Sequence, residues 1–182
     1  MLKIDHPCQA WTLPDFLTGE ECAALIERGE QQGFEEALIQ TQNGQILFKG
    51  IRNNDRVLFD DPLLAQRLFQ HARPHLPEQW GDWALLGFNE RFRFYRYQSG
   101  QYFKWHRDGS YVRDEQECSQ LTFMIYLNDG YEGGLTEFRE EKIQPARGTA
   151  LIFSHGLLHQ GSPILSGSKY VLRTDVMYRL RA

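Results

Sequence analysis

Apolar and polar residues alternate with a period of two through most of the C-terminal half of the chain. Side chains of a strand point alternately to the two faces of a sheet, so this pattern predicts strands with one buried face. Gly, Asn or Asp stands in most of the breaks, and breaks at this spacing are typical of a sandwich or a double-sheet barrel. The predicted strands are 84–88, 91–98, 101–106, 121–127, 135–138, 149–154 and 169–179.

The N-terminal half carries two helix signals and one turn signal. Thr18, followed three residues later by Glu21, forms a capping-box pattern at the start of a run of helix formers. Asp61-Pro62 combines a cap with proline at the first helical position, and leucines recur after it at helical spacing. Asn43-Gly44 lies between two strand-like runs and predicts a two-residue hairpin turn.

These elements predict a mainly β protein with flanking helices, an α+β fold whose core is a jelly roll (a double-stranded β-helix). A chain of 182 residues is long enough to bury a sizeable core and short enough to favour one domain. We therefore expect a single domain over 1–182. In this domain a helical N-terminal support spans 12–80 and the jelly-roll core spans 84–180.

Charge and cysteine content narrow the functional classes. A net charge of -4 argues against a surface that coats nucleic acid, so no nucleic-acid partner is expected. No apolar run approaches the roughly 18 residues that span a bilayer, and the N-terminus has no apolar signal-peptide core, so no membrane partner is expected. The three cysteines are odd in number and scattered, which favours a reducing compartment, the cytoplasm.

The candidate chemistry lies at the ends of two predicted strands. His106 and Asp108 are two residues apart, so on an extended chain their side chains share one face. About fifty residues later another apolar strand ends in a segment that contains His155 and His159. Two histidines and one carboxylate with open coordination positions are typical of non-heme Fe(II) oxygenases, and either later histidine could complete such a set.

An ordered set of motifs extends this pattern. The chain from about residue 84 onward resembles the 2-oxoglutarate- and Fe(II)-dependent dioxygenases of prolyl 4-hydroxylase type, and FLTGEECAALI resembles the leading helix of that family less distinctively. The matching residues are Tyr97-x-x-Gly100-x-Tyr102, His106-x-Asp108, Tyr126-Leu127-Asn128, Gly133-Gly134-x-Thr136-x-Phe138, Gly148 to Phe153, and His159-x-Gly161-x-Pro163 to Gly167-x-Lys169.

The resemblance implies a role for each candidate site residue. The family has its distal histidine just before Gly-x-Pro, so His159 rather than His155 would join His106 and Asp108 as the catalytic metal ligands. The distal carboxylate of 2-oxoglutarate needs a buried cation. Lys169, ten positions after the distal histidine, is favoured over Arg173, and the other of the two would pair with Asp175. Tyr126 would hydrogen-bond the same carboxylate, and Tyr97 would line the cosubstrate pocket.

The implied reaction is hydroxylation of an unactivated C–H with Fe(II), 2-oxoglutarate and O2, with ascorbate as an additional candidate. The substrate would be a prolyl or other side chain of a protein or peptide. Two alternatives stay open, namely the same chemistry on a free amino acid or small metabolite, and a non-catalytic metal-binding jelly-roll module.

Two loops, 40–56 and 109–120, are the candidates for substrate recognition. The loop 109–120 is either a mobile lid over the iron or a plain solvated loop. Six residues are expected to form a polar groove that would suit a peptide backbone or a polar metabolite equally, and these are Arg52, Asn53, Asn54, Arg56, Asn89 and Arg91.

Overall fold

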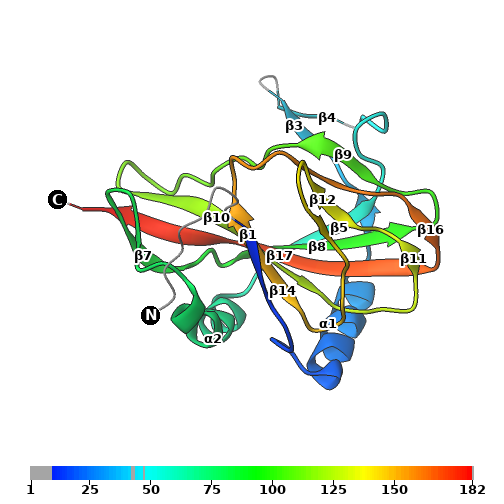
Figure 1. Cartoon of the computed structure of the whole chain (residues 1–182), viewed down its shortest axis with the longest axis horizontal. Helices are drawn as coiled ribbons and strands as arrows, with labels where there is room; N and C mark the ends of the chain where they lie inside the picture. The colour runs from blue at the N-terminus through cyan, green and yellow to red at the C-terminus, as the bar shows by residue number, and fades with distance from the viewer. Residues whose placement is uncertain (1–9, 42–43, 47, 182) are drawn as a thin grey trace.

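A computed structural model describes residues 10–41, 44–46 and 48–181 of the chain. Two antiparallel sheets face each other, and two helices pack on the outer side of the larger sheet (Figure 1). The architecture is the expected one, a mainly β jelly roll with flanking helices. None of the helices in the described ranges is long and apolar enough to cross a bilayer.

The large sheet has nine strands, all paired antiparallel. Its main path runs through β1 (Ala10–Leu13), β14 (Ala150–Ser154), β10 (Glu117–Tyr126), β17 (Ser168–Leu180), β8 (Arg91–Gln98), β5 (Asp55–Asp60) and β2 (Glu35–Glu36). Beside this path, β7 (Trp83–Phe88) pairs with β17 and with β6 (Gln79–Trp80). Segments before residue 84 thus contribute strands to the large sheet as well as helices against it.

The small sheet lies over the other face of the large one. It consists of β13 (Lys142–Ile143), β12 (Thr136–Phe138), β15 (His159–Gly161) and β9 (Phe103–His106), in that order. Two further ribbons are β11 (Glu132–Gly133) with β16 (Ile164–Ser166), and β3 (Ile39–Thr41) with β4 (Gly44–Ile46). The predicted pairing of these two runs is therefore present, but the predicted turn is not the observed one: Gly44 pairs with Thr41 and belongs to β4, and Asn43 lies outside the described residues.

Local sequence explains the two helices. In α1 (Gly19–Gln32) the Thr18 side chain accepts from the Glu21 amide, and Glu21 accepts in return from the Thr18 amide, which is the predicted capping box. In α2 (Pro62–Ala72) the Asp61 side chain accepts from the Leu64 amide. A short 3-10 helix, η1 (Arg73–His75), follows α2 and contains Pro74, which cannot continue an α-helix.

Two apolar cores lie on opposite faces of the large sheet, because successive side chains of a strand alternate. Phe92 and Phe94 of β8 pack with the helices, whereas Tyr95 and Tyr97 point between the two sheets. The larger core thus fixes the helices, and the smaller one supports the space between the sheets.

The observed strands differ from the predicted ones in their bounds and in their number. β10 begins at Glu117, four residues before the predicted start, so the candidate lid is a loop only over 109–116. β5 was not predicted, and it pairs along its whole length with β8. β15 and β16 were also missed, since the segment around them carries few apolar residues.

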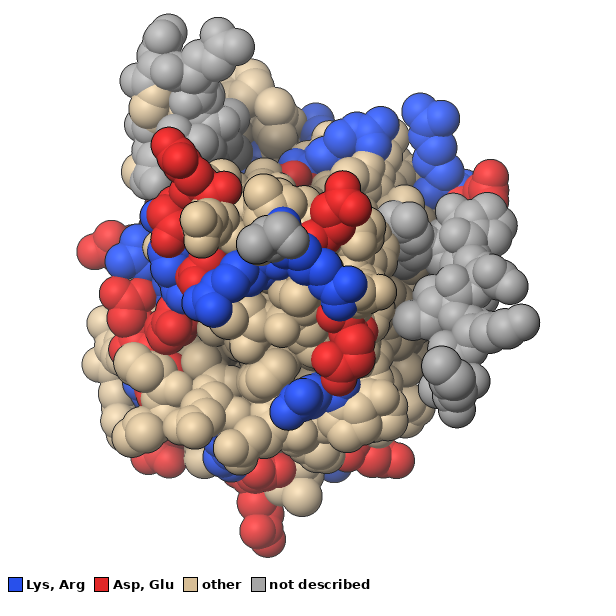
Figure 2. Space-filling model, turned by 90° about the vertical axis from the view of Figure 1, so that its left-hand side faces the viewer, with Lys and Arg blue, Asp and Glu red and all other residues tan. Residues whose placement is uncertain are grey.

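Acidic and basic side chains are interspersed on the face that Figure 2 shows, with Lys and Arg in a broken band across its middle and Asp and Glu on both sides of it. That face therefore presents no extended field of a single sign.

Candidate metal centre

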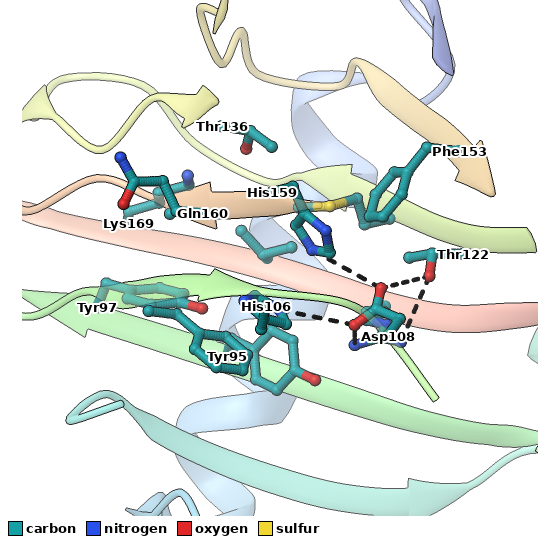
Figure 3. A pocket seen from close by; sticks show the side chains of 15 residues that line it. Tyr95, Tyr97, His106, Asp108, Thr122, Thr136, Phe153, His159, Gln160 and Lys169 are labelled. Carbon is teal, nitrogen blue, oxygen red and sulfur yellow. Dashed lines mark hydrogen bonds and ion pairs between the residues drawn. The ribbon is translucent and has the colours of Figure 1, made fainter. Parts of the chain in front are cut away.

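Three side chains at one end of the neighbouring strands β9 and β15 converge on one point. His106 ends β9 and His159 begins β15, and the two residues are register partners in the antiparallel pairing of these strands. Asp108 follows β9 by two residues. Its Oδ1 lies 3.6 Å from His106 Nε2 and its Oδ2 lies 3.8 Å from His159 Nε2 (Figure 3). One ligand atom from each residue lies within 4.8 Å of the others, so a single metal ion can bridge all three.

Backbone contacts orient both imidazoles toward Asp108. His106 Nδ1 lies 2.7 Å from the Lys104 carbonyl oxygen, and His159 Nδ1 lies 3.0 Å from the Leu157 carbonyl oxygen. Each carbonyl accepts a hydrogen bond from Nδ1–H, which leaves Nε2 of each ring unprotonated and free for a metal. The backbone thus fixes the tautomer that a metal ligand needs.

The protonation states also suit a divalent cation. Burial lowers the pKa of His106 to about 3, with the neighbouring His159 as the second cause, and burial lowers the pKa of His159 as well. Burial alone would raise the pKa of Asp108, but Arg173 and the two imidazoles hold it well below its usual range. Neutral imidazoles and an ionised carboxylate are the forms that bind metal, so the residues present fit the ion.

A buried chain of hydroxyls and imidazole holds Asp108 in place. Thr122 Oγ1 donates to Asp108 Oδ2 at 2.6 Å and, in turn, lies 2.9 Å from His155 Nδ1. Ser119 Oγ lies 2.7 Å from His155 Nε2, and the Asp108 amide donates to the His155 carbonyl at 3.1 Å. His155, the rival candidate ligand, therefore lies outside the cluster and supports Asp108 through Thr122.

Lys169 and Arg173 both point from β17 into the space between the sheets, but their surroundings differ. Lys169 is 4% exposed, its Nζ donates to the Gly134 carbonyl at 2.6 Å, and it has no carboxylate partner among the described residues. Burial lowers the pKa of Lys169 to about 7. Arg173 instead pairs with Asp108 at 2.9 Å and with Asp175 at 3.5 Å. Of these two cations, Lys169 is the one that lacks an anion among the described residues.

The two candidate tyrosines lie near Lys169. Their rings lie 5.8 Å (Tyr97) and 5.1 Å (Tyr126) from Lys169 Nζ. Tyr97 lines a cavity together with Lys169 and the three-residue cluster, and burial raises its pKa to about 12. Tyr126 lies behind this lining, where its hydroxyl donates to Thr136 Oγ1 at 2.7 Å and burial raises its pKa. Thr136 itself lines the cavity, a position that sequence reasoning had not assigned a role.

The predicted polar groove is only partly present. Arg52 and Arg56 line a second cavity that also reaches the cluster. Asn89 does not line this cavity, and its Nδ2 donates to Asp175 Oδ2 at 3.4 Å. Arg91 does not line it either, and its Nε forms an ion pair with Asp60 Oδ1 at 2.9 Å. Asn89 and Arg91 are therefore not part of the groove. Asn89 lies in the turn before β8 and Arg91 is the first residue of β8, so both lie at the opposite end of the strand from Tyr97.

The comparisons with known proteins agree with this geometry. Residues 92–174 match the model of the 2OG-Fe(II) oxygenase superfamily. No curated protein sequence matches the chain.

Solved prolyl hydroxylases share the fold. A viral collagen prolyl hydroxylase from Paramecium Bursaria Chlorella virus-1, solved as a 2OG complex, is 24% identical with a TM-score of 0.67, over 96% of this chain and 98% of that one. A Pseudomonas putida prolyl-4-hydroxylase is 17% identical with a TM-score of 0.67, over 97% and 95% of the two chains. A Trichoplax adhaerens prolyl hydroxylase, in complex with a hypoxia inducible factor peptide, is 16% identical with a TM-score of 0.68, over 96% and 84%.

The matched segment contains the cluster and Lys169, and it runs through the strands that hold them. Residues 92–174 are thus similar in sequence to the 2OG-Fe(II) oxygenase superfamily, and the chain shares its fold with solved prolyl hydroxylases.

Proposed function

We propose that His106, Asp108 and His159 hold the Fe(II) and that Lys169 binds the distal carboxylate of 2-oxoglutarate. The observation that carries this proposal is the buried, unpaired ammonium of Lys169 in the same cavity as the cluster. A buried charge is costly without a counter-ion, and a ligand carboxylate would supply one. Arg173 is less suited to this role, because Asp108 and Asp175 already neutralise it.

The surrounding residues would orient the cosubstrate. Tyr97 and Thr136 line the cavity with Lys169, so their hydroxyls can hydrogen-bond the same distal carboxylate. Tyr126 would act through Thr136, whose hydroxyl it already contacts. When bound, Fe(II) with 2-oxoglutarate and O2 supplies the oxidising power for the reaction. The chain contributes ligands in the correct protonation states and a cavity wall of Phe153, Val171 and Met124 that limits water.

The substrate that this site best supports is a prolyl or other side chain of a protein or peptide, hydroxylated at an unactivated C–H. The similar folds include a collagen prolyl hydroxylase and a prolyl hydroxylase with a bound peptide, which favours this class. A free amino acid or small metabolite is the second candidate, because the cavity outside the cluster has a volume of about 620 Å³, within the usual range for small-molecule sites. We place the activity in the cytoplasm, in keeping with the free thiols of Cys22 and Cys118.

Succinate formation from 2-oxoglutarate tests the catalytic proposal. Fe(II)-loaded protein in air is expected to release succinate without added substrate, slowly, and faster with a substrate. A panel of proline-containing peptides and free amino acids, read by mass spectrometry for the gain of one oxygen atom, then separates the two substrate classes. If no succinate forms beyond a metal-free control, the protein is not an oxygenase of this kind.

A further inference from the structure

A cavity rich in arginine adjoins the metal cluster on the side away from Lys169. Five arginines line it, namely Arg52, Arg56, Arg93, Arg107 and Arg173. Asp108, the candidate metal ligand, is the one carboxylate in the same lining. The two cavities share five lining residues, namely Tyr95, Phe103, His106, Asp108 and Arg173, so a molecule in the arginine-lined cavity can reach the iron position while 2-oxoglutarate occupies the other cavity.

The positive charge of this cavity is only partly neutralised. Arg93 and Arg173 share Asp175, at 2.8 and 3.5 Å, and Asp175 is fully buried behind them. Arg52, Arg56 and Arg93 line the same cavity, and burial lowers the pKa of Arg56, with the like charge of Arg52 as the second cause. An anion that enters the cavity would reduce the electrostatic repulsion among these cations and would therefore be attracted to it.

Arg52 is a buried cation of this cavity that has no carboxylate partner among the described residues. Its residue is 4% exposed, its Nε donates to Asn54 Oδ1 at 2.6 Å, and its Nη2 is buried without a partner among the described residues. The sequence from 37 to 54, which precedes and contains Arg52, has no Asp or Glu that could supply a counter-ion. A buried arginine with an unused donor indicates a missing acceptor.

Aromatic rings fix the position of Arg52 relative to the metal cluster. Its guanidinium carbon lies 4.5 Å from the ring centroids of both Tyr95 and Phe103. Phe103 in turn stacks on His106 with ring centroids 3.5 Å apart. The guanidinium is therefore held one ring away from a metal ligand, and an acceptor must approach it in its own plane, as a carboxylate does.

We propose that the substrate of this enzyme carries a carboxylate that binds Arg52 while the carbon to be oxidised lies at the metal cluster. This inference rests on the proposed function, since it assumes that the cluster is the reaction centre. The carboxylate is either the α-carboxylate of a free amino acid or the acidic side chain of a peptide, and both would offer the same group to the same guanidinium.

Binding of matched carboxylates and carboxamides tests the proposal. The protein is loaded with Fe(II) and saturating 2-oxoglutarate without O2, so that Lys169 is occupied and no turnover takes place. One arm titrates the common L-amino acids and their carboxamides, and the other titrates N-acetyl, C-amidated Pro-Asp and Pro-Asn peptides, both by calorimetry. We expect the carboxylate member of at least one pair to bind about tenfold or more tightly than its amide, and the arm that shows this identifies the source.

Variants then assign the preference to Arg52. Arg52→Gln should abolish the preference for carboxylate, and Arg52→Lys should keep part of it. Arg67→Gln, which changes an exposed arginine that pairs with Glu21 on the helices, should retain it in full. The inference is overturned if no carboxylate in either arm binds better than its amide, or if Arg52→Gln keeps the preference. Absence of the preference in the wild-type pairs overturns the inference even where a variant fails to fold, and succinate formation in air reports separately on the proposed function.

Discussion

Replacing Lys169 with methionine tests most directly whether the Lys169 ammonium binds 2-oxoglutarate. Methionine has similar length and no charge, so it fills the buried position and removes only the ammonium. The side chain has a single hydrogen-bond acceptor in the protein, the Gly134 carbonyl, and no ion pair among the described residues. The loss should therefore fall on 2-oxoglutarate binding and not on the stability of the fold.

The expected increase in Kd follows from the burial of the ion pair that Lys169 would form with the distal carboxylate of 2-oxoglutarate. Truncating one partner of a buried, hydrogen-bonded charge pair costs about 2–5 kcal/mol. The lower figure corresponds to roughly a 30-fold increase in Kd, at about 1.4 kcal/mol per factor of ten. Because the pKa of Lys169 is about 7, the side chain is half protonated at pH 7 in the free protein. Protonating it fully on binding costs only about 0.4 kcal/mol, which reduces the binding free energy of 2-oxoglutarate only slightly. We expect the Kd for 2-oxoglutarate to rise at least about 30-fold at pH 7.

The same pKa predicts a dependence on pH. Burial depresses the pKa of Lys169 in the free protein, and the bound carboxylate needs the charged form, so affinity is fully present below pH 7 and falls as the pH rises above it. From pH 7 to 8.5 the charged fraction falls by roughly 15-fold, and the wild-type Kd should rise by that factor. The Kd of Lys169→Met should be almost constant over this interval.

Calorimetric titration of metal-loaded protein with 2-oxoglutarate, without O2, measures both effects. Lys142→Met is the matched control, because that lysine is exposed on β13 and its removal should leave the Kd unchanged. A Kd for Lys169→Met within threefold of wild type at pH 7 would refute the reasoning and would transfer the carboxylate site to Arg173.

Three other substitutions have definite expected outcomes. Asp108→Ala should abolish succinate formation and metal binding, read by calorimetry with Mn(II), while the circular dichroism spectrum stays that of wild type. Thr122→Val removes the hydroxyl that donates to Asp108, so metal affinity should fall about 10- to 100-fold. Gly148→Ala should cost more than about 1 kcal/mol in urea unfolding, because φ is 79° and the new Cβ would lie 2.2 Å from the Leu17 carbonyl oxygen. Gly81→Ala, with positive φ but open space, should cost less.

Alternation along the chain predicted strands such as β8 and β17, but each of them buries both of its faces, one in each apolar core, where the pattern had predicted one buried face. It missed β5, because Asp55 and Asp60 at its ends read as loop residues. Both are paired across the strand, Asp55 with Arg96 at 3.1 Å and Asp60 with Arg91 at 2.9 Å. Charge pairs between strands depend on register, and register is not visible in one strand's own sequence.

The candidate metal ligands were predictable because their sequence spacing or a surrounding sequence motif indicates them. His106 and Asp108 follow from their separation of two residues, and His159 was chosen over His155 by its motif, with which the observed cluster agrees. The role of His155 was not predictable, because it arises from Thr122 and Ser119, two polar residues of a mostly apolar strand. Arg52 was grouped with polar neighbours, but its aromatic partners come from β8 and β9 and appear only in the fold.

Iron binding by paired histidine variants tests the central claim most directly. Wild-type protein, His159→Ala and His155→Ala are incubated with Fe(II) without O2, and bound iron and subsequent succinate formation are measured. We predict one Fe(II) per chain and succinate for wild type, neither for His159→Ala, and weakened but measurable binding for His155→Ala. Full iron binding and succinate formation by His159→Ala would contradict the proposed metal centre.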